Sequence, residues 1–247
     1  MRSIVATAIL LLTLAPAYSG ERPRDIVDAA TIVPGLIVDM RYLGARNFVG
    51  RPIPGYVAEK CLLTRRAALA LKRVQEELRA KNLGLKVYDC YRPRRAVKAF
   101  VAWARDVPDQ AMKPDFYPDV DKRALFRKGY ISSRSGHSRA STVDLTIVPL
   151  DAAAVTPVAA SGPIRACAAT REDRAPDTSL DMGSGFDCFD PLSHTGNPRV
   201  GKQARGNRAM LRSLMSKHGF GNAPEEWWHY TLRGEPYPGT YFDFPVQ

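Results

Sequence analysis

The chain has 247 residues, of which 45% are hydrophobic and 9% aromatic, a composition that is typical of a globular protein and excludes wholesale disorder. Its formal net charge is +11 at pH 7, which favours anionic surroundings. Because the basic residues are scattered along the chain rather than gathered in one run, we expect no nucleic acid among its partners.

Residues 1–19 have the pattern of a cleaved secretory signal peptide. Arg2 supplies the positively charged n-region, Ile4 to Leu14 form an apolar run, and Ala15 to Ser19 form the cleavage region with its small residues. The apolar run is too short to span a bilayer and no later segment reaches about 18 uncharged apolar residues, so we expect no stable membrane insertion. We predict an exported, periplasmic protein in which residues 20–247 form one domain, and we make no prediction of its oligomeric state.

Apolar residues at helical spacing predict three helices. Thr64 can cap the first, which covers residues 65–80. The second covers residues 94–105, and the third covers residues 204–217 and ends before Gly219.

Alternating or apolar runs predict strands at residues 85–91, 142–148 and 226–233. A polar loop is expected from the second helix to about Tyr130, and a long surface excursion from about residue 151 to residue 181. Helices and strands mix without a regular alternation. This order predicts an α+β fold with a mostly antiparallel central sheet and flanking helices.

The four cysteines are expected to form disulfides, because their number is even and the protein is predicted to be exported. Four cysteines allow three pairings, and the sequence does not decide among them. We favour Cys61 with Cys90 and Cys167 with Cys188, because each pair brackets one compact segment. The absence of any C-x-x-C pair argues against a zinc site made of cysteines.

The chain has four histidines, so a histidine-based metal site must draw on a small set. His218 comes at the end of a predicted helix, where it can bind the last carbonyls, and we interpret it as structural. His194 has no acidic neighbour at ligand spacing and receives the same interpretation.

His137 lies in a small-residue turn that leads into the strand containing Asp144, and such a turn can bring both side chains to one point. With His229 they make two imidazoles and one carboxylate, which is a set that Zn²⁺ accepts in catalytic sites with a fourth position for water. Glu226 is the carboxylate nearest in sequence to one of these ligands and a candidate base. Residues three apart point to opposite faces of a regular strand, so Glu226 requires a turn or bulge before His229, or a place before the strand.

Several short motifs follow one another along the mature chain. In chain order they are Asp39-Met40-Arg41-Tyr42, Asn47-Phe48-Val49-Gly50, Gly55-Tyr56, Tyr88-Asp89-Cys90-Tyr91-Arg92-Pro93, Ser135-Gly136-His137-Ser138-Arg139, Asp144-Leu145-Thr146, Met182-Gly183-Ser184-Gly185-Phe186-Asp187, Glu226-Trp227-Trp228-His229-Tyr230 and Tyr241-Phe242-Asp243-Phe244-Pro245.

Together these motifs resemble those of the zinc-dependent D-alanyl-D-alanine dipeptidases, a family that includes the vancomycin-resistance dipeptidase and shares its fold with D-Ala-D-Ala peptidases and the hedgehog signalling domain. The resemblance implies a metallopeptidase that hydrolyses the dipeptide D-Ala-D-Ala. It also implies a Zn²⁺ cofactor held by His137, Asp144 and His229, with Glu226 as general base and acid.

The resemblance further implies that Arg92 stabilises the developing oxyanion and that Asp187, assisted by Ser135, holds the free ammonium of the substrate. From the residues alone, Arg92 could equally be a surface turn residue and Asp187 an exposed loop acid. Two alternative functions remain open beside the dipeptidase. One is a D,D-carboxypeptidase that acts on longer cell-wall peptides, and the other is a non-catalytic zinc-stabilised binding domain.

Two residues depart from the family pattern. Ala140 stands where the family has Gly, and Thr142 stands where it has Ala. If the first position requires a positive φ, Ala140 carries a strain cost. We also expect the excursion at residues 151–181 to be longer than the family's corresponding connection. Since an exported enzyme does not reach the cytoplasmic precursors, the expected role is scavenging of D-Ala-D-Ala released from peptidoglycan.

Overall fold

The computed structural model describes residues 20–150, 166–174 and 177–247. The predicted signal peptide at residues 1–19 lies outside the described residues, and so do residues 151–165 and 175–176 of the predicted excursion.

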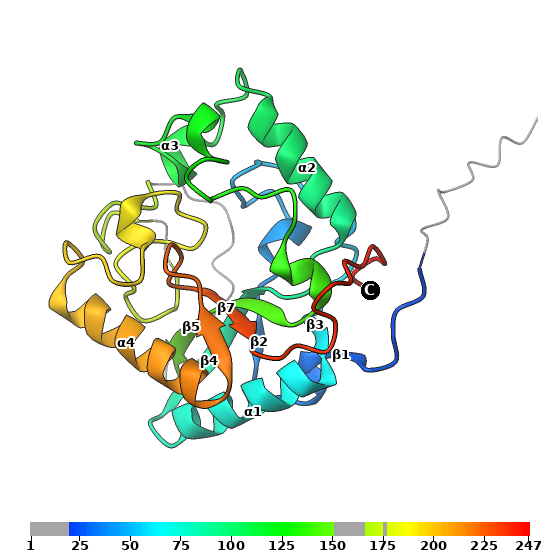
Figure 1. Cartoon of the computed structure of the whole chain (residues 1–247). Helices are drawn as coiled ribbons and strands as arrows, with labels where there is room; N and C mark the ends of the chain where they lie inside the picture. Colours follow the sequence, from blue (N-terminus) through cyan, green and yellow to red (C-terminus); the bar gives the residue numbers. More distant parts are fainter. Residues whose placement is uncertain (1–19, 151–165, 175–176) are drawn as a thin grey trace, which may run out of the picture.

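A five-stranded sheet forms the centre of the fold (Figure 1). Its strands, in spatial order, are β2 (Ile37–Val38), β4 (Leu83–Asp89), β5 (Thr142–Pro149), β7 (His229–Leu232) and β6 (Phe220–Asn222). Only the β2–β4 pair is parallel. The mixed architecture confirms the α+β prediction with a mostly antiparallel sheet.

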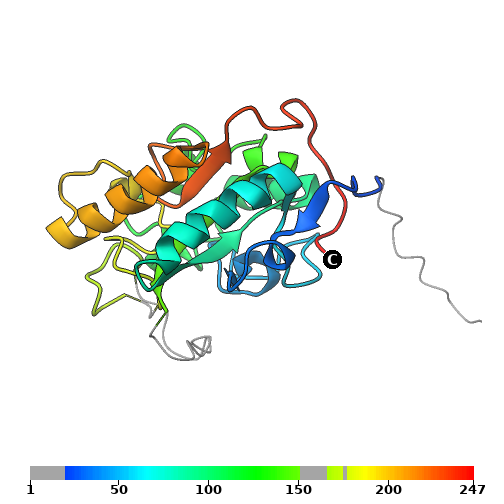
Figure 2. The ribbon, with the colours of Figure 1, turned by 90° about the horizontal axis from the view of Figure 1, so that it is seen from below.

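Helices α1 (Arg65–Arg79) and α4 (Lys202–Lys217) lie side by side on one face of this sheet (Figure 2). Helices α2 (Arg94–Arg105) and α3 (Lys113–Phe116) lie on the opposite side (Figure 1). The predicted cap of α1 is present, because Thr64 Oγ1 accepts a hydrogen bond from the backbone N–H of Ala67. The three predicted helices therefore exist, and each agrees with its predicted bounds to within two residues.

The structure also contains elements that the sequence did not predict. A second sheet pairs β1 (Ile26–Asp28) with β3 (Leu62–Thr64). The expected polar loop before Tyr130 contains α3 and a 3-10 turn at Lys122–Ala124. These segments have three to four residues each, which is too short for a periodic pattern to reveal.

The last predicted strand starts later than expected. It begins at His229 rather than Glu226, because the backbone N–H of His229 donates to the carbonyl of Glu226 at 3.3 Å and closes a turn. Glu226 thus enters from just before the strand, which is one of the two arrangements that the sequence required.

Both favoured disulfides are present. Cys61–Cys90 ties the start of β3 to the end of β4 with a Cα–Cα distance of 5.2 Å, and Cys167–Cys188 closes the described part of the excursion at 5.4 Å. A buried hydrophobic core continues from the sheet into the loops beneath α2, where Tyr42, Phe48 and Phe100 pack together.

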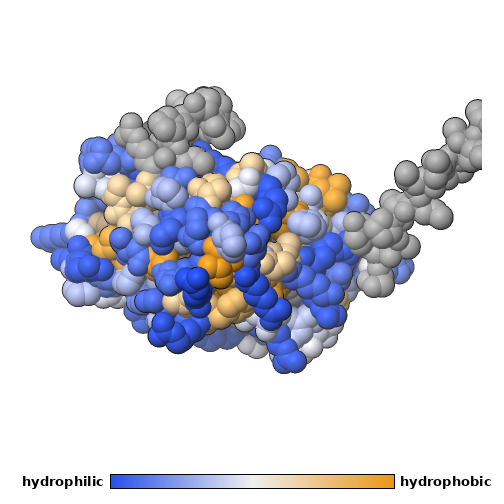
Figure 3. Space-filling view, turned by 90° about the horizontal axis from the view of Figure 1, so that it is seen from above, coloured by the Kyte–Doolittle hydropathy of each residue, from blue (hydrophilic) through white to orange (hydrophobic). Residues whose placement is uncertain are grey.

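Hydrophilic side chains cover most of the face shown in Figure 3. Among the described residues the exposed large hydrophobic side chains are Val57, Leu69, Phe126 and Leu150. Within the described part of the chain, every helix is too short or too polar to cross a bilayer.

Candidate active site

Three polar residues form a row across neighbouring strands of the central sheet. Asp144 on β5 pairs with His229 at the start of β7, and on its other side with Asp89 at the end of β4. The register of β4 shifts between Val87 and Asp89, and this irregularity brings Asp89 opposite Asp144. Directly paired residues share a face of the sheet, so the register brings the side chains of Asp144 and His229 together.

His137 reaches this row from a 3-10 turn at Gly136–Arg139 that Ser135 caps. The Oγ of Ser135 accepts a hydrogen bond from the backbone N–H of His137 at 3.3 Å. The Nδ1 of His137 lies 2.7 Å from the carbonyl oxygen of Cys90. Because a carbonyl can only accept, Nδ1 carries the proton and Nε2 offers its lone pair to the row.

The side chains of His137, Asp144 and His229 converge on one point. The Nε2 of His137 lies 3.2 Å from Asp144 Oδ2, and the Nδ1 of His229 lies 3.1 Å from Asp144 Oδ1. One candidate ligand atom from each residue lies within 4.8 Å of the others. Burial acts to raise the pKa of Asp144, but the two imidazoles outweigh it and hold that pKa well below its usual range.

This cluster fits a metal ion. Asp144 Oδ1 is buried and accepts no hydrogen bond, although it lies beside an imidazole nitrogen. A buried carboxylate oxygen without a donor is costly unless a cation satisfies it. Two imidazoles and a carboxylate are also the donor set of three-ligand zinc sites with an open position.

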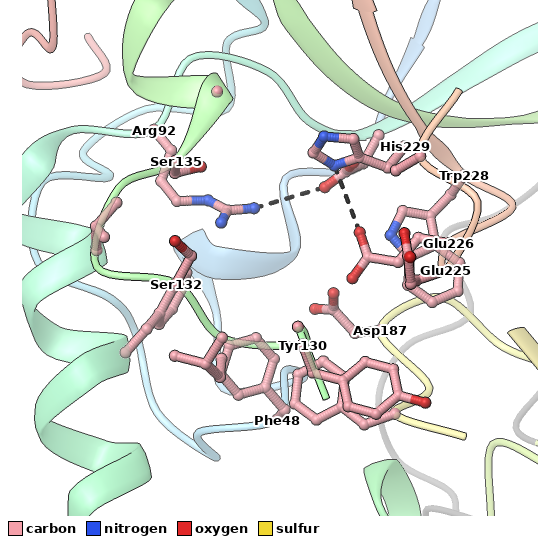
Figure 4. Close-up of a pocket in the computed structure, with 18 of the residues that line it drawn as sticks. Phe48, Arg92, Tyr130, Ser132, Ser135, Asp187, Glu225, Glu226, Trp228 and His229 are labelled. Atoms are coloured by element: carbon pink, nitrogen blue, oxygen red, sulfur yellow. Dashed lines mark ion pairs between the residues drawn. The ribbon is translucent and has the colours of Figure 1, made fainter. Parts of the chain in front are cut away.

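Glu226 stands beside the cluster. Its Oε2 lies 3.4 Å from the Nδ1 of His229, a contact drawn as a dashed line in Figure 4. Burial, to which the negative charge of Asp144 adds, raises the pKa of Glu226 to about 7. A carboxyl group with such a pKa can both take and return a proton near neutral pH. Between these residues, Trp227 and Trp228 are buried in the core.

Arg92 is held on the other side of the row. Its Nε donates to Asp89 Oδ2 at 2.8 Å, and a terminal nitrogen lies 3.5 Å from Asp144 Oδ2. The guanidinium also lies 5.1 Å from the ring centres of Tyr42 and Phe100. Arg92 is therefore not a surface turn residue, because it points into the site from a fixed position.

Asp187 is buried at the far side of the cavity, and its Oδ2 accepts a hydrogen bond from the hydroxyl of Tyr42 at 2.8 Å. Its backbone has a φ of 57°, which is rare outside glycine and asparagine. Burial, with Asp144 adding to it, raises the pKa of Asp187 well above its usual value. Asp187 is thus not the exposed loop acid that its sequence position allowed.

These groups surround a cavity of about 230 Å³ (Figure 4). Its described lining includes Arg92, Ser135, Asp144, Asp187, Glu226 and His229, while His137 lies buried behind them. We call this space the active-site cavity. It brings together every side chain to which the sequence assigned a metal, catalytic or substrate role.

Negative charge exceeds positive charge at the buried end of this cavity. Among the described residues at this end, the acidic side chains of Asp89, Asp144, Asp187 and Glu226 lie around the guanidinium of Arg92, while Glu225 and Arg134 also line the cavity. The site can therefore accept further cations, which is the property expected of a pocket for a metal ion and an ammonium group.

The two departures from the family pattern follow the turn that carries His137: Ala140 ends this turn and Thr142 begins β5. Ala140 has a φ of 57°, so the strain expected at this position is present. The Oγ1 of Thr142 lies 3.0 Å from that of Thr231 on β7. A Cβ on Gly136 would meet Thr142 Oγ1 at 2.7 Å, so Thr142 leaves no space for a side chain there.

The sequence assigned no role to three residues that support the site. Asp89 accepts hydrogen bonds from Tyr56 and Arg92, and Tyr42 holds Asp187. These three residues, Asp89, Tyr56 and Tyr42, all lie in the short motifs quoted above. Their place in a motif was the only sequence feature that could have pointed to a role in the site. Neither His194 nor His218 belongs to the cluster, and His218 Nε2 instead lies 2.6 Å from Glu77 Oε1.

Comparisons with known proteins find similar chains that share one description. A family profile described as D-ala-D-ala dipeptidase matches residues 22–162 and 149–247. A D-alanyl-D-alanine dipeptidase of Streptomyces coelicolor is 38% identical over 222 residues, which cover 90% of this chain and 98% of the relative. Relatives of the same name are 37% identical in Enterococcus faecium, over 87% of this chain and 95% of the relative, and 30% identical in Escherichia coli, over 84% of each.

Among solved structures, one similar chain is a mutant of the vancomycin resistance D,D-pentapeptidase VanY in complex with Zn(II). The match has a TM-score of 0.38 and 12% sequence identity, and it covers 80% of this chain and 86% of that chain.

Proposed function

Because this chain belongs to the D-Ala-D-Ala dipeptidase family and is a metallopeptidase, we propose that it hydrolyses free D-Ala-D-Ala to two molecules of D-alanine with Zn²⁺ as its cofactor. The observation that carries the proposal is the convergence of the metal-ligand atoms of His137, Asp144 and His229 beside Glu226. A structural metal site does not need an additional carboxylate with a raised pKa, whereas a hydrolytic site does.

His137, Asp144 and His229 would hold the metal. When bound there, Zn²⁺ supplies Lewis-acid chemistry that activates water and polarises the peptide carbonyl. One of these ligands is already held in position, because the Nδ1–H of His137 donates to the carbonyl of Cys90. That bond fixes the ring orientation and the tautomer.

Glu226 is the proton carrier in this proposal. It takes a proton from the attacking water as a C–O bond forms at the peptide carbonyl, and it gives the proton to the amine nitrogen as the C–N bond breaks. Its place in a turn before β7 brings the carboxylate to the same point as His229. The products are two free D-alanine molecules, so atoms and charge balance without any other reactant.

Arg92 would stabilise the negative charge that develops on the carbonyl oxygen. Its guanidinium is fixed by Asp89 and faces Asp144 within the site, so little reorganisation is required during the reaction. Asp187, held by Tyr42, would bind the free ammonium of the substrate. Ser135 lines the cavity on the side of Arg92 and would assist in positioning the substrate.

The requirement for a free ammonium separates the proposal from a D,D-carboxypeptidase. Zinc-loaded protein should release D-alanine from D-Ala-D-Ala and fail to release it from an N-acetylated peptide ending in the same pair, because an acetyl group removes the charge that Asp187 binds. Free D-alanine can be followed with a coupled oxidase. Cleavage of the blocked peptide alone would overturn the proposal in favour of the carboxypeptidase.

The proposed place of action is the periplasm, where the enzyme would scavenge D-Ala-D-Ala released from the cell wall. The support is the pattern of residues 1–19 and the four cysteines, which pair in two disulfides. Fractionation with N-terminal sequencing tests this place of action. A cytoplasmic protein that retains its first residues would contradict it.

A further inference from the structure

A second pocket opens directly beside the active-site cavity. It has a volume of about 540 Å³ and lies between the start of α2, residues 133–138 and residues 239–241. Val97, Arg134 and Ser135 line both spaces. The second pocket therefore adjoins the active-site cavity on the side where Ser135 stands.

The charged residues that line this second pocket are all cations. They are Arg94, Lys98 and Arg134, and no carboxylate belongs to its described lining. None of the three forms an ion pair with an acid among residues 20–150, 166–174 and 177–247. We call this space the basic pocket.

The two acids nearest in sequence to the lining residues are engaged elsewhere. Asp243 accepts hydrogen bonds from the backbone and side chain of Arg95. Glu235 accepts from Arg139 at 2.8 Å. The positive charge of the basic pocket is therefore not cancelled by its surroundings.

Arg134 stands where the two spaces join. Its guanidinium lies 5.9 Å from the ring centre of Tyr241, which also lines the basic pocket. Arg134 can thus contact a group that extends from one space into the other.

The position of Asp187 decides which end of a substrate faces the basic pocket. In Figure 4 Asp187 lies beside Glu226, whereas Ser132 and Ser135 lie on the opposite side of the cavity, next to Arg92. If the ammonium of the substrate binds Asp187, the residue that leaves as an amine points toward Ser135. The basic pocket begins there.

We propose that the basic pocket is a specificity subsite that binds a carboxylate carried by the leaving residue, beyond the α-carboxylate of D-alanine itself. The inference rests on the proposed function, because the substrate orientation comes from it. The substrate class is then D-dipeptides with a free amino group and an acidic second residue, or short peptides whose third residue brings its α-carboxylate into this pocket.

The test compares D-Ala-D-Glu with D-Ala-D-Gln, which have nearly the same shape and differ by one charge. We expect kcat/KM to be about fivefold higher for D-Ala-D-Glu at low salt, because exposed charge pairs contribute modestly. The preference should shrink in about 0.5 M salt. Equal values for the two dipeptides, together with equal values for the tripeptide pair described below, would overturn the proposal.

A double variant, Arg94→Gln with Lys98→Gln, should abolish this preference. Arg105→Gln is the matched control, because Arg105 ends the same helix, is exposed and does not line the pocket. It should keep the ratio of the two kcat/KM values. If the ratio of the two kcat/KM values fell equally in the double variant and in Arg105→Gln, the preference would be a general effect of net charge. That result would contradict a specific subsite in the basic pocket.

A binding measurement separates this inference from the proposed reaction. In the variant Glu226→Gln, calorimetry should find D-Ala-D-Glu bound more tightly than D-Ala-D-Gln by about the same factor. Equal binding of these two dipeptides, with equal binding of the tripeptide pair below, overturns the subsite even if D-Ala-D-Ala is hydrolysed by the unmodified enzyme. Tighter binding supports the subsite even if hydrolysis fails and the proposed reaction with it.

The source of the carboxylate is resolved by one further pair of ligands, D-Ala-D-Ala-Gly and its C-terminal amide. A preference for the free acid of the tripeptide, lost in the double variant, assigns the pocket to a third residue. A preference confined to D-Ala-D-Glu over D-Ala-D-Gln assigns it to the side chain of the second residue. A preference in neither pair contradicts the proposal.

Discussion

Two clusters of largely buried polar side chains include residues of β4, and they differ in how their charges are matched. The first, which we call the Asp177 cluster, consists of Asp39, Arg41, Lys86, Tyr88 and Asp177. Asp177 Oδ1 accepts hydrogen bonds from Lys86 and from the backbone of Ser179, and Oδ2 accepts from Arg41 and Tyr88. Two acids face two bases, and both oxygens of Asp177 have donors.

The second cluster is the active site, where the balance is different. Asp144 Oδ1 is buried without a donor, and four carboxylates face the guanidinium of Arg92. Burial and charge are common to both clusters. The excess of acids distinguishes the active site, and a cation bound between His137, Asp144 and His229 would relieve it.

The largest effect is expected from removing a metal ligand. His137→Ala should reduce bound zinc from about one per chain to a small fraction and reduce kcat/KM by more than about 10⁴-fold, since both the water activation and the carbonyl polarisation depend on the metal. Metal analysis by mass spectrometry and dipeptide hydrolysis measure these effects.

The control is His218→Ala, because His218 pairs with Glu77 far from the cavity. It should keep both the zinc and the activity. If His218→Ala lost zinc as completely as His137→Ala, the assignment of ligands would be wrong.

A pair of matched substitutions should change stability in opposite directions. Asp177→Asn should lower the free energy of unfolding by about 2–4 kcal/mol, because it leaves buried Lys86 without its partner. Asp187→Asn should raise the free energy of unfolding of the metal-free protein by about 1–2 kcal/mol, because it removes a buried carboxylate that lacks a cation. Urea unfolding in the presence of a chelator measures both.

The pH dependence of the two effects follows from the pKa shifts. Burial acts to raise the pKa of Asp177, but Lys86 and Arg41 outweigh it and hold it well below its usual range. Its contribution is therefore present above the unfolded pKa of about 3.9 and lost as the pH falls toward the folded value.

Burial raises the pKa of Asp187, so its ionised form lowers stability above an unfolded pKa of about 3.9. The gain from Asp187→Asn should then be present at neutral pH and disappear in acid. A loss of stability in Asp187→Asn at neutral pH would contradict the comparison between the clusters.

The smallest effect concerns the turn that carries His137. Ala140→Gly should raise the free energy of unfolding by about 0.5–1 kcal/mol, because Ala140 has a φ of 57° and glycine adopts this conformation without strain. Thermal unfolding measures the change. An unchanged or lower stability would show that the surrounding contacts already remove the strain.

The parts of the fold that depend on local sequence could be predicted. Thr64 caps α1 as its hydroxyl suggested, and periodicity placed α2 at its observed bounds. The short turn at Gly136–Arg139 was also predictable from its small residues, and it brings His137 to Asp144 as expected.

The parts that depend on pairing between distant strands could not be predicted. The irregularity in β4 that brings Asp89 opposite Asp144 has no local signature, so the residue that fixes Arg92 was missed. Likewise, a strand was expected from Glu226, but the turn to His229 follows only from the way this segment meets β5 and β6. The Asp177 cluster could not be predicted either, because Asp177 lies far in sequence from Arg41 and Lys86, with which it pairs.

The central claim is that Glu226 carries the proton while His137, Asp144 and His229 hold the metal. It is tested most directly by measuring bound zinc and the rate of D-Ala-D-Ala hydrolysis in the same preparation of Glu226→Gln. The account predicts about one zinc per chain and a kcat reduced by about 10²–10⁴-fold. Loss of zinc together with activity would show that Glu226 is a ligand, and retained activity would show that it is not the base; either result would contradict the account.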